Sequence, residues 1–320
     1  MAPFNSVLLT MSPVLLALAA FEILWLKSKR RAYHWQDAAV SLVDMLIRQV
    51  VVFTLVSNIL LRVGPVFYAH RLYTLPLRTG SDWHVMTLVL LFFGLEFFYY
   101  WFHRWSHTVR WFWATHAVHH SPNSMSFLTA ERLGWTQNLS AGVLTFLPLV
   151  WLGFRPEDVL AALGINLIYQ YWLHTEIIGK LGWIEGVFNT PSNHRVHHGS
   201  NPQYLDANYG GVLIIFDRIF GTYVVEEEQV IFGLVKPLMS KNPITIALHE
   251  WRAIALDASR HWRSGRRLLG YLFGPPGWSH DASRKTSLQL KAERHLAAAP
   301  DTLPEAGRGD ARRLEIHGVP

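Results

Sequence analysis

The chain has 320 residues, of which half are hydrophobic, 16% are charged and none is cysteine. A disordered chain needs low hydrophobicity and high charge, and a disulfide-framed or thiolate-metal protein needs cysteine, so these classes are excluded. The mean hydropathy is positive, and the apolar residues lie in long runs. The chain also holds 17 histidines, which is many for a protein with so few charges.

The first apolar run, at 6–26, contains one charged residue and is followed by the basic segment 27–31. It is long enough to cross a bilayer at about 1.5 Å per residue. A cleaved signal peptide is the alternative, because Ala17, Ala19 and Ala20 resemble a cleavage site. The basic residues lie after the run and not before it, so we favour an uncleaved span.

Later runs raise the expected number of spans to about four or five. They cover 39–61, 83–102, 139–154 and 157–178. The last begins with Pro156, Glu157 and Asp158, which suit a helix N-terminus. We therefore expect an all-α fold, a polytopic membrane helical bundle.

Basic residues also predict the orientation of these spans. The segment 27–31 should stay in the cytoplasm, whereas the loop 64–82 offers only Arg71 and Arg78. Residues 103–138, and those from about 179 onward, are then cytoplasmic. The protein would be an integral, multi-pass protein of the cytoplasmic membrane in a bacterium, or of the endoplasmic reticulum in a eukaryote.

The positive charge is concentrated near the end of the chain. Residues 241–320 hold 13 Lys and Arg against 8 Asp and Glu, a surplus of five out of the six in the whole chain. Within them, 246–270 mixes large apolar residues with arginines, which is typical of an amphipathic helix on an anionic membrane surface. Nucleic-acid binding is the weaker interpretation, and we expect no nucleic-acid partner.

Nine of the histidines are clustered in spacings that suit a chelate. They form HxxxH, HxxHH, a lone histidine and a second HxxHH: His103, His107, His116, His119, His120, His174, His194, His197 and His198. Residues three or four apart share a helix face. Two HxxHH motifs are expected by chance on the order of once in a thousand such sequences. The eight scattered histidines are interpreted as interfacial residues.

Two polar stripes lead to these histidines. Glu96 and Tyr100 continue to His103 and His107 at intervals of four, three and four, and Asn166 and Gln170 continue to His174 at intervals of four. Polar groups at membrane depth are costly unless they face the interior of the bundle. The stripes therefore predict one shared internal site.

The available ligands limit the choice of metal. Without cysteine, imidazole ligands suit zinc, copper, iron or nickel. One zinc needs three or four ligands, and eight or nine histidines exceed that number, so we expect two metal ions. The HExxH signature of zinc hydrolases is absent. We favour two iron ions over zinc or haem.

At this point the chain resembles a known family. The tract EFFYYWFHRWSH at 96–107, the motif HAVHHS at 116–121, the segment YWLHTEIIG at 171–179 and the tract at 189–223 with NTPSNHRVHHG are similar to the fatty acid hydroxylase and sterol desaturase superfamily of integral-membrane di-iron proteins. Within that superfamily, 189–223 looks most like alkylglycerol monooxygenases and their bacterial relatives. The resemblance covers roughly 90–240.

This resemblance implies a helical membrane fold with a cytoplasmic di-iron cap, and it gives all nine clustered histidines the role of metal ligands. It divides the chain into membrane spans with an external loop (1–82), a catalytic domain (83–240), a basic membrane-surface segment (241–280) and a disordered tail (281–320). The residues after HAVHHS differ from the family pattern and are expected to line the substrate pocket.

Carboxylates close to the histidines should orient the imidazole rings. The candidates are Glu96, Glu176 and Asp206, with Asn208 as a neutral partner. Each of them has a structural role as its alternative. Asp44 and Arg48, one turn apart, are expected to form a structural pair rather than to hold substrate.

The expected function is an O2-dependent di-iron oxygenase that hydroxylates or desaturates a C–H bond of a membrane lipid: a sterol, a fatty acyl chain or an ether lipid. The chain has no GxGxxG nucleotide fingerprint after a strand, so electrons would come from a partner protein or a small reductant. The alternatives are a zinc-dependent membrane hydrolase and a non-catalytic metal-binding membrane protein.

Overall fold

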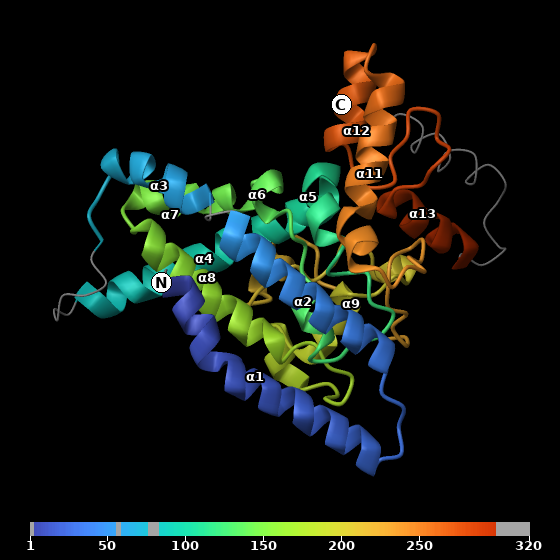
Figure 1. Ribbon diagram of the computed structural model, residues 1–320, viewed down its shortest axis with the longest axis horizontal. Helices are drawn as coiled ribbons and strands as arrows, with labels where there is room; N and C mark the ends of the chain where they lie inside the picture. The colour runs from blue at the N-terminus through green and yellow to red at the C-terminus, as the bar shows by residue number, and fades with distance from the viewer. Residues whose placement is uncertain (1–2, 56–58, 76–82, 299–320) are drawn as a thin grey trace.

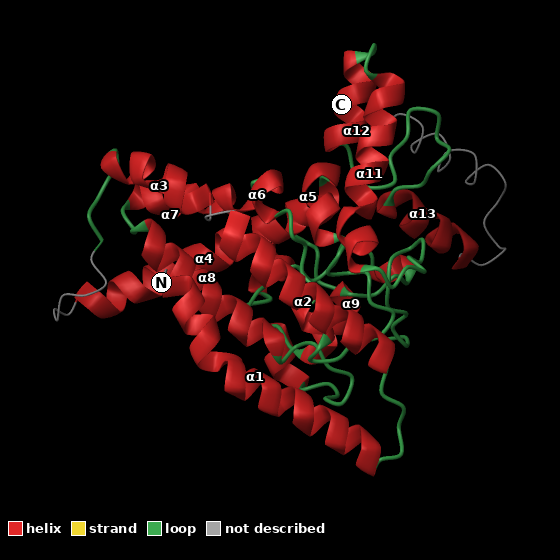
Figure 2. Ribbon diagram, viewed as in Figure 1, coloured by secondary structure: helices red, strands yellow, loops and turns green. Residues whose placement is uncertain are grey.

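The protein is described by a computed structural model, which covers residues 3–55, 59–75 and 83–298. These residues form helices and loops without any β-strand, as Figure 2 shows. The α-helices are, in chain order, α1 (Pro3–Ser28), α2 (Trp35–Leu55), α3 (Ile59–Ala69), α4 (Trp83–Thr108), α5 (Arg110–His116), α6 (Gln137–Ser140), α7 (Leu147–Leu152), α8 (Pro156–Tyr171), α9 (Pro191–His197), α10 (Ile215–Ile219), α11 (Pro243–His261), α12 (Gly265–Phe273) and α13 (Ser287–Ala298).

An apolar arm and a loop-rich body make up the molecule (Figure 1). In the arm, α3, α4, α7 and α8 share a core that includes Leu60, Leu95, Leu149 and Leu160. The long helix α1 packs along α8. In the body, the last turns of α4 together with short helices and loops carry the clustered histidines, and the paired helices α11 and α12 project from it.

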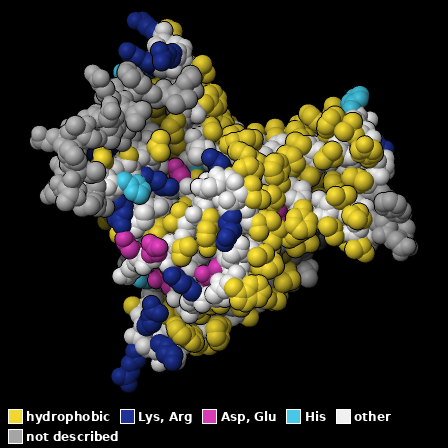
Figure 3. Space-filling view, turned by 180° about the vertical axis from the view of Figure 1, so that it is seen from behind, with side chains coloured by type: hydrophobic (Ala, Val, Ile, Leu, Met, Phe, Trp, Pro, Cys, Tyr) yellow, Lys and Arg dark blue, Asp and Glu magenta, His cyan; other side chains and the backbone are white. Residues whose placement is uncertain are grey.

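Two helices are long and apolar enough to cross a membrane, in the segments Met11–Ser28 of α1 and Val85–Thr108 of α4. Both leave large apolar side chains exposed, such as Leu24 at 65% and Val85 at 66%. Exposed apolar surface of this extent needs a lipid or protein neighbour. The hydrophobic side chains cover much of the arm in Figure 3. The expected count of four to five spans is not confirmed.

The two apolar runs at 139–154 and 157–178 form shorter elements than a continuous span requires. The run 139–154 is divided into α6, the 3-10 helix Gly142–Phe146 and α7, because Ala141 adopts a left-handed φ of 58° and ends α6. The last run gives α8, which begins at Pro156 as predicted and ends at Tyr171 after 16 residues. Gly153, at φ 132°, turns the chain between α7 and α8, where a Cβ atom would lie 2.3 Å from the Tyr73 carbonyl oxygen.

Helix α2 is held to the body by a polar stripe. The stripe includes Asp37, Ser41, Asp44 and Arg48, at intervals of four, three and four, and it faces the segment 121–133. Arg48 forms an ion pair with Glu131 at 3.7 Å, and Asp44 accepts a hydrogen bond from the Leu133 amide. Asp44 and Arg48 therefore have a structural role, as expected. Their partners are residues of the loop 121–133.

The end of the described chain differs from the expected disordered tail. Residues 287–298 form α13, which packs on the 3-10 helix Pro202–Tyr204, and Arg294 pairs with Glu228. Residues 299–320 lie outside the described residues. The predicted amphipathic segment 246–270 is helical, in the form of two helices, α11 and α12, separated at 262–264.

A buried arginine joins the α11–α12 pair to the body. The Arg110 side chain is 4% exposed and donates to Glu250 and to Asp257, each at 2.7 Å. Replacing Arg110 with Met should destabilise the protein by about 3 kcal/mol, at the lower end of the cost of a broken buried pair, because Asp257 keeps Arg284.

Thermal unfolding in detergent would measure this loss. The control is Arg155→Met, which removes an exposed pair with Glu157 at 3.8 Å and should cost less than about 1 kcal/mol. Equal losses for both variants would contradict the importance of the buried pair.

Candidate metal centre

Five separate segments bring the nine clustered histidines together. His103 and His107 lie on the last turns of α4, and His116 ends α5. His119 and His120 follow in the next turn, and His174 follows α8. The last three, His194, His197 and His198, come from α9 and the residue after it. The nine rings divide into a group of five and a group of four, and in each group the candidate ligand atoms lie within 4.8 Å of one another.

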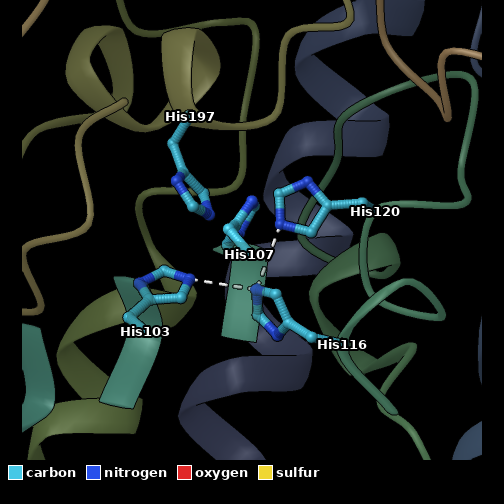
Figure 4. Close-up of side chains that lie close together, drawn as sticks. All are labelled: His103, His107, His116, His120 and His197. Atoms are coloured by element: carbon cyan, nitrogen blue, oxygen red, sulfur yellow. Dashed lines mark hydrogen bonds between the residues drawn. The ribbon is translucent and has the colours of Figure 1, made fainter. Parts of the chain in front are cut away.

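The five-histidine group consists of His103, His107, His116, His120 and His197. In Figure 4 these rings converge on a common centre from different segments. The Nε2 atoms of His103 and His116 are 3.0 Å apart, and those of His120 and His116 are 3.2 Å apart. Nitrogen atoms from distant segments thus meet in one place.

The four-histidine group consists of His119, His174, His194 and His198. Its Nε2 atoms are also close, at 3.1 Å between His119 and His174 and 3.0 Å between His174 and His194. The two groups adjoin each other, because the rings of His120 and His198 stack with their centroids 4.2 Å apart. This arrangement places two clusters of imidazole nitrogen atoms side by side.

Backbone carbonyl groups fix the orientation of four of the rings. The Nδ1 atoms of His103, His119, His174 and His197 lie 2.8 to 3.1 Å from the carbonyl oxygens of Tyr209, Arg132, Gln170 and Ala207, respectively. A carbonyl oxygen only accepts, so Nδ1 must carry the proton and Nε2 of the neutral ring keeps its lone pair.

The pair His119 and His174 shows the consequence. Both rings donate Nδ1–H to a carbonyl, so their Nε2 lone pairs face each other at 3.1 Å without a proton between them. Neutral rings in that state repel, unless a cation lies close enough to accept both lone pairs. The donor set therefore fits a metal ion.

Four further imidazole nitrogen atoms are buried without a hydrogen-bond partner among the described residues: His107 Nε2, His194 Nδ1, His197 Nε2 and His198 Nε2. Burial lowers the pKa of His119 to about 4 and holds the pKa of His120 and His198 well below the usual value, with neighbouring histidines adding to the effect. The rings are thus neutral at physiological pH, which is the form that binds a metal.

Local sequence explains the placement of the third histidine motif. Pro191 occupies the first turn of α9, and the Thr190 hydroxyl accepts from the Asn193 amide as an N-cap. The helix has seven residues and is almost entirely buried. Arg195 ties it to its surroundings through a two-pronged ion pair with Glu226, with N–O distances of 2.8 and 2.7 Å.

Of the four residues expected to orient the rings, Asp206 lies beside a clustered histidine. Its Oδ1 atom is 3.8 Å from Nδ1 of His107. Glu96 accepts from the amides of Val212 and Leu213, Glu176 accepts from the Met125 amide, and Asn208 bonds to the backbone of Asn193 and Val224. These three hold loops, and the carbonyl groups orient the rings.

Sequence reasoning missed a set of anchors from the N-terminal helices. Buried Glu22 of α1 accepts from the Phe127 amide at 2.9 Å and from the Thr175 hydroxyl. Arg132, whose carbonyl binds His119, donates to Ser41 and to the Asp37 carbonyl on α2. The signal in the sequence was the regular spacing of polar residues on α2, but its partners could not be read from it.

A small cavity of about 10 Å³ adjoins the four-histidine group. It is lined by His119, His174 and His198 and by the segment after the second motif, including Met125 and Thr129. That segment was expected to line a substrate pocket, and it does border the histidines.

The fold and the site define a class: a helical protein with apolar, span-length helices and a buried centre built from nine imidazoles. Residues 88–222 match the model of the fatty acid hydroxylase family. The chain therefore carries a fatty acid hydroxylase domain, which is consistent with the predicted superfamily.

Several curated proteins resemble the chain. Alkylglycerol monooxygenase of Homo sapiens is 39% identical over 216 residues, which are 65% of this chain and 45% of that protein. The Danio rerio enzyme of that name is 46% identical over 165 residues, 51% of this chain and 36% of that protein. Ornithine lipid hydroxylase OlsE of Rhizobium tropici is 31% identical over 140 residues, 43% of this chain and 41% of that protein.

The chain therefore spans less than half the length of these relatives. All three are oxidoreductases by name; two are named for alkylglycerol and one for ornithine lipid. No solved structure shows a significant match.

Replacing one histidine of the four-histidine group should remove one metal ion. We expect His194→Ala to lower the metal content measured by mass spectrometry from two ions per chain to one, because the five-histidine group remains complete. The exposed His34 gives the control, and His34→Ala should keep both ions. Unchanged metal content in His194→Ala would contradict the assignment of the four-histidine group.

Proposed function

We propose that the protein is an O2-dependent di-iron oxygenase that hydroxylates or desaturates a C–H bond of a membrane lipid. The observation that carries this proposal is the pair of adjoining imidazole groups, in which proton-free nitrogen atoms face one another. Names of the relatives, which are monooxygenases and hydroxylases acting on lipids, support the same reaction class.

The division of the ligands favours two metal ions. The nine histidines together exceed the number of ligands that one ion takes. Each group alone, with five or four histidines, has enough ligands for one ion. All nine, His103, His107, His116, His119, His120, His174, His194, His197 and His198, are the proposed ligands. Iron is favoured over zinc because oxidation of an unactivated C–H bond needs a redox metal.

Two iron ions would supply the redox chemistry by which dioxygen oxidises an unactivated C–H bond. The protein holds the Nε2 atoms of His103, His119, His174 and His197 inward through its carbonyl groups. Asp206 is proposed to attract the Nδ1 proton of His107. The small cavity bordered by Met125 limits water beside the four-histidine group.

The proposed substrate is a lipid because the centre lies at the end of a candidate span. His103 and His107 occupy the last turns of the apolar segment Val85–Thr108, so the site would lie near the membrane surface. A sterol, a fatty acyl chain and an ether lipid all remain substrate classes of the proposal. Electrons would come from a partner protein or a small reductant.

The proposed topology is integral and multi-pass, with the site facing the cytoplasm. Since the chain has no cysteine, single introduced cysteines can test it with a membrane-impermeant maleimide. His70→Cys should be labelled in intact cells, because its loop is external. Lys241→Cys should be labelled only after permeabilisation. Both positions are exposed, and the reverse labelling pattern would overturn the orientation.

Comparative lipidomics tests the reaction. Cells with the wild-type gene should contain a lipid that has gained one oxygen or lost two hydrogens, and cells with His197→Ala should lack it because a ligand of the five-histidine group is missing. His34→Ala should retain the product. Metal analysis with Mössbauer spectroscopy identifies the ions. One zinc and no iron, in protein made with iron available, would favour a zinc-dependent hydrolase and overturn the proposal.

A further inference from the structure

A second cavity, of about 650 Å³, lies outside the metal centre. Its size is within the range of about 300–1,000 Å³ that small-molecule sites occupy. The walls are mostly apolar and come from four parts of the chain: Trp105 of α4, the segment Val109–Phe112 around the start of α5, residues 140–145, and Phe273 at the end of α12. We refer to it as the apolar groove.

The groove and the metal centre use different faces of α4. His103 and His107 are four residues apart and share one face. Trp105 stands two residues from each of them, which places it about 160° to 200° around the helix. The groove is therefore separate from the five-histidine group, and its occupant need not be the substrate.

Aromatic side chains join the groove to the α11–α12 pair. The ring centroid of Trp111 lies 5.9 Å from that of Phe273 on α12 and 4.9 Å from that of Trp251 on α11. Trp105 is 39% exposed and Phe273 is 50% exposed, so the groove opens to the surroundings. Tryptophan is enriched at the level of lipid headgroups.

On helix α12, Arg266 lies on the same face as Phe273, which lines the groove. Arg266, Leu269 and Phe273 recur at intervals of three and four, so they share one stripe, and all three are exposed. At about 1.5 Å per residue, Arg266 stands roughly 10 Å along the helix from Phe273. Figure 3 shows Lys and Arg side chains at the end of the projecting pair and hydrophobic side chains continuing along the arm.

We propose that the apolar groove binds one acyl chain of an anionic membrane phospholipid, whose phosphate is held by Arg266. An apolar cavity with a cation about two helical turns away matches the separation of a lipid chain from its headgroup. The neighbouring arginines of the pair, Arg260, Arg263 and Arg267, are also exposed and make the surroundings favourable for negative charge.

Native mass spectrometry of the full chain in detergent tests the proposal, with phosphatidylglycerol and phosphatidylcholine as probes. The wild type should retain one phosphatidylglycerol per chain in preference to phosphatidylcholine. Arg266→Gln should reduce that preference about fivefold, the effect of one cation beside an anionic lipid. The matched control is Arg267→Gln, which lies one residue off the stripe and should change the preference much less.

A filled groove should no longer hold the lipid. Thr145→Trp places a bulky ring in the cavity. Phe273→Ser, at an exposed position, removes part of the wall and serves as a second variant if Thr145→Trp does not fold. Metal content equal to wild type shows that each variant is folded. Retention of one lipid by both folded variants would overturn the groove, and equal changes in Arg266→Gln and Arg267→Gln would overturn the phosphate contact. Neither result depends on the proposed oxygenase activity.

Discussion

The candidate metal centre depends on hydrogen bonds that four histidine rings donate to backbone carbonyl groups. Each bond fixes which nitrogen atom is protonated and turns the other toward the centre, as between His119 and His174. A side-chain carboxylate could rotate away from the ring, whereas the position of a backbone carbonyl group is fixed by the path of the backbone. The geometry of the centre is therefore set by the loops that present Arg132, Ala207 and Tyr209.

The loop that presents Arg132 is held by residues outside the family match. Residues 88–222 match the family model, yet Glu22 of α1 and Asp37 and Ser41 of α2 bind the segment 121–133. Leaving such buried polar groups unpaired costs about 1–3 kcal/mol each. The N-terminal helices thus belong to the structure of the centre, and removing them would release the loop that carries Met125 beside the cavity.

Sequence spacing was sufficient for the helical fold and for the set of nine histidines that the structure brings together, because three- and four-residue intervals define helix faces directly. It could not divide the nine into groups of five and four, since His119 and His120 are adjacent in sequence but enter different groups. Nor could it show that Glu96 binds the amides of Val212 and Leu213. That contact, like the carbonyl groups near the rings, depends on the path of distant loops, which leaves no local pattern.

Helix α4 connects the candidate metal centre to the apolar groove. Its apolar segment Val85–Thr108 is a candidate span, and its final turns present His103 and His107 on one face and Trp105 on another. A helix is stiff over this length because each turn is held by its own backbone hydrogen bonds. The depth of the span in a bilayer would therefore fix the height of both the metal centre and the apolar groove.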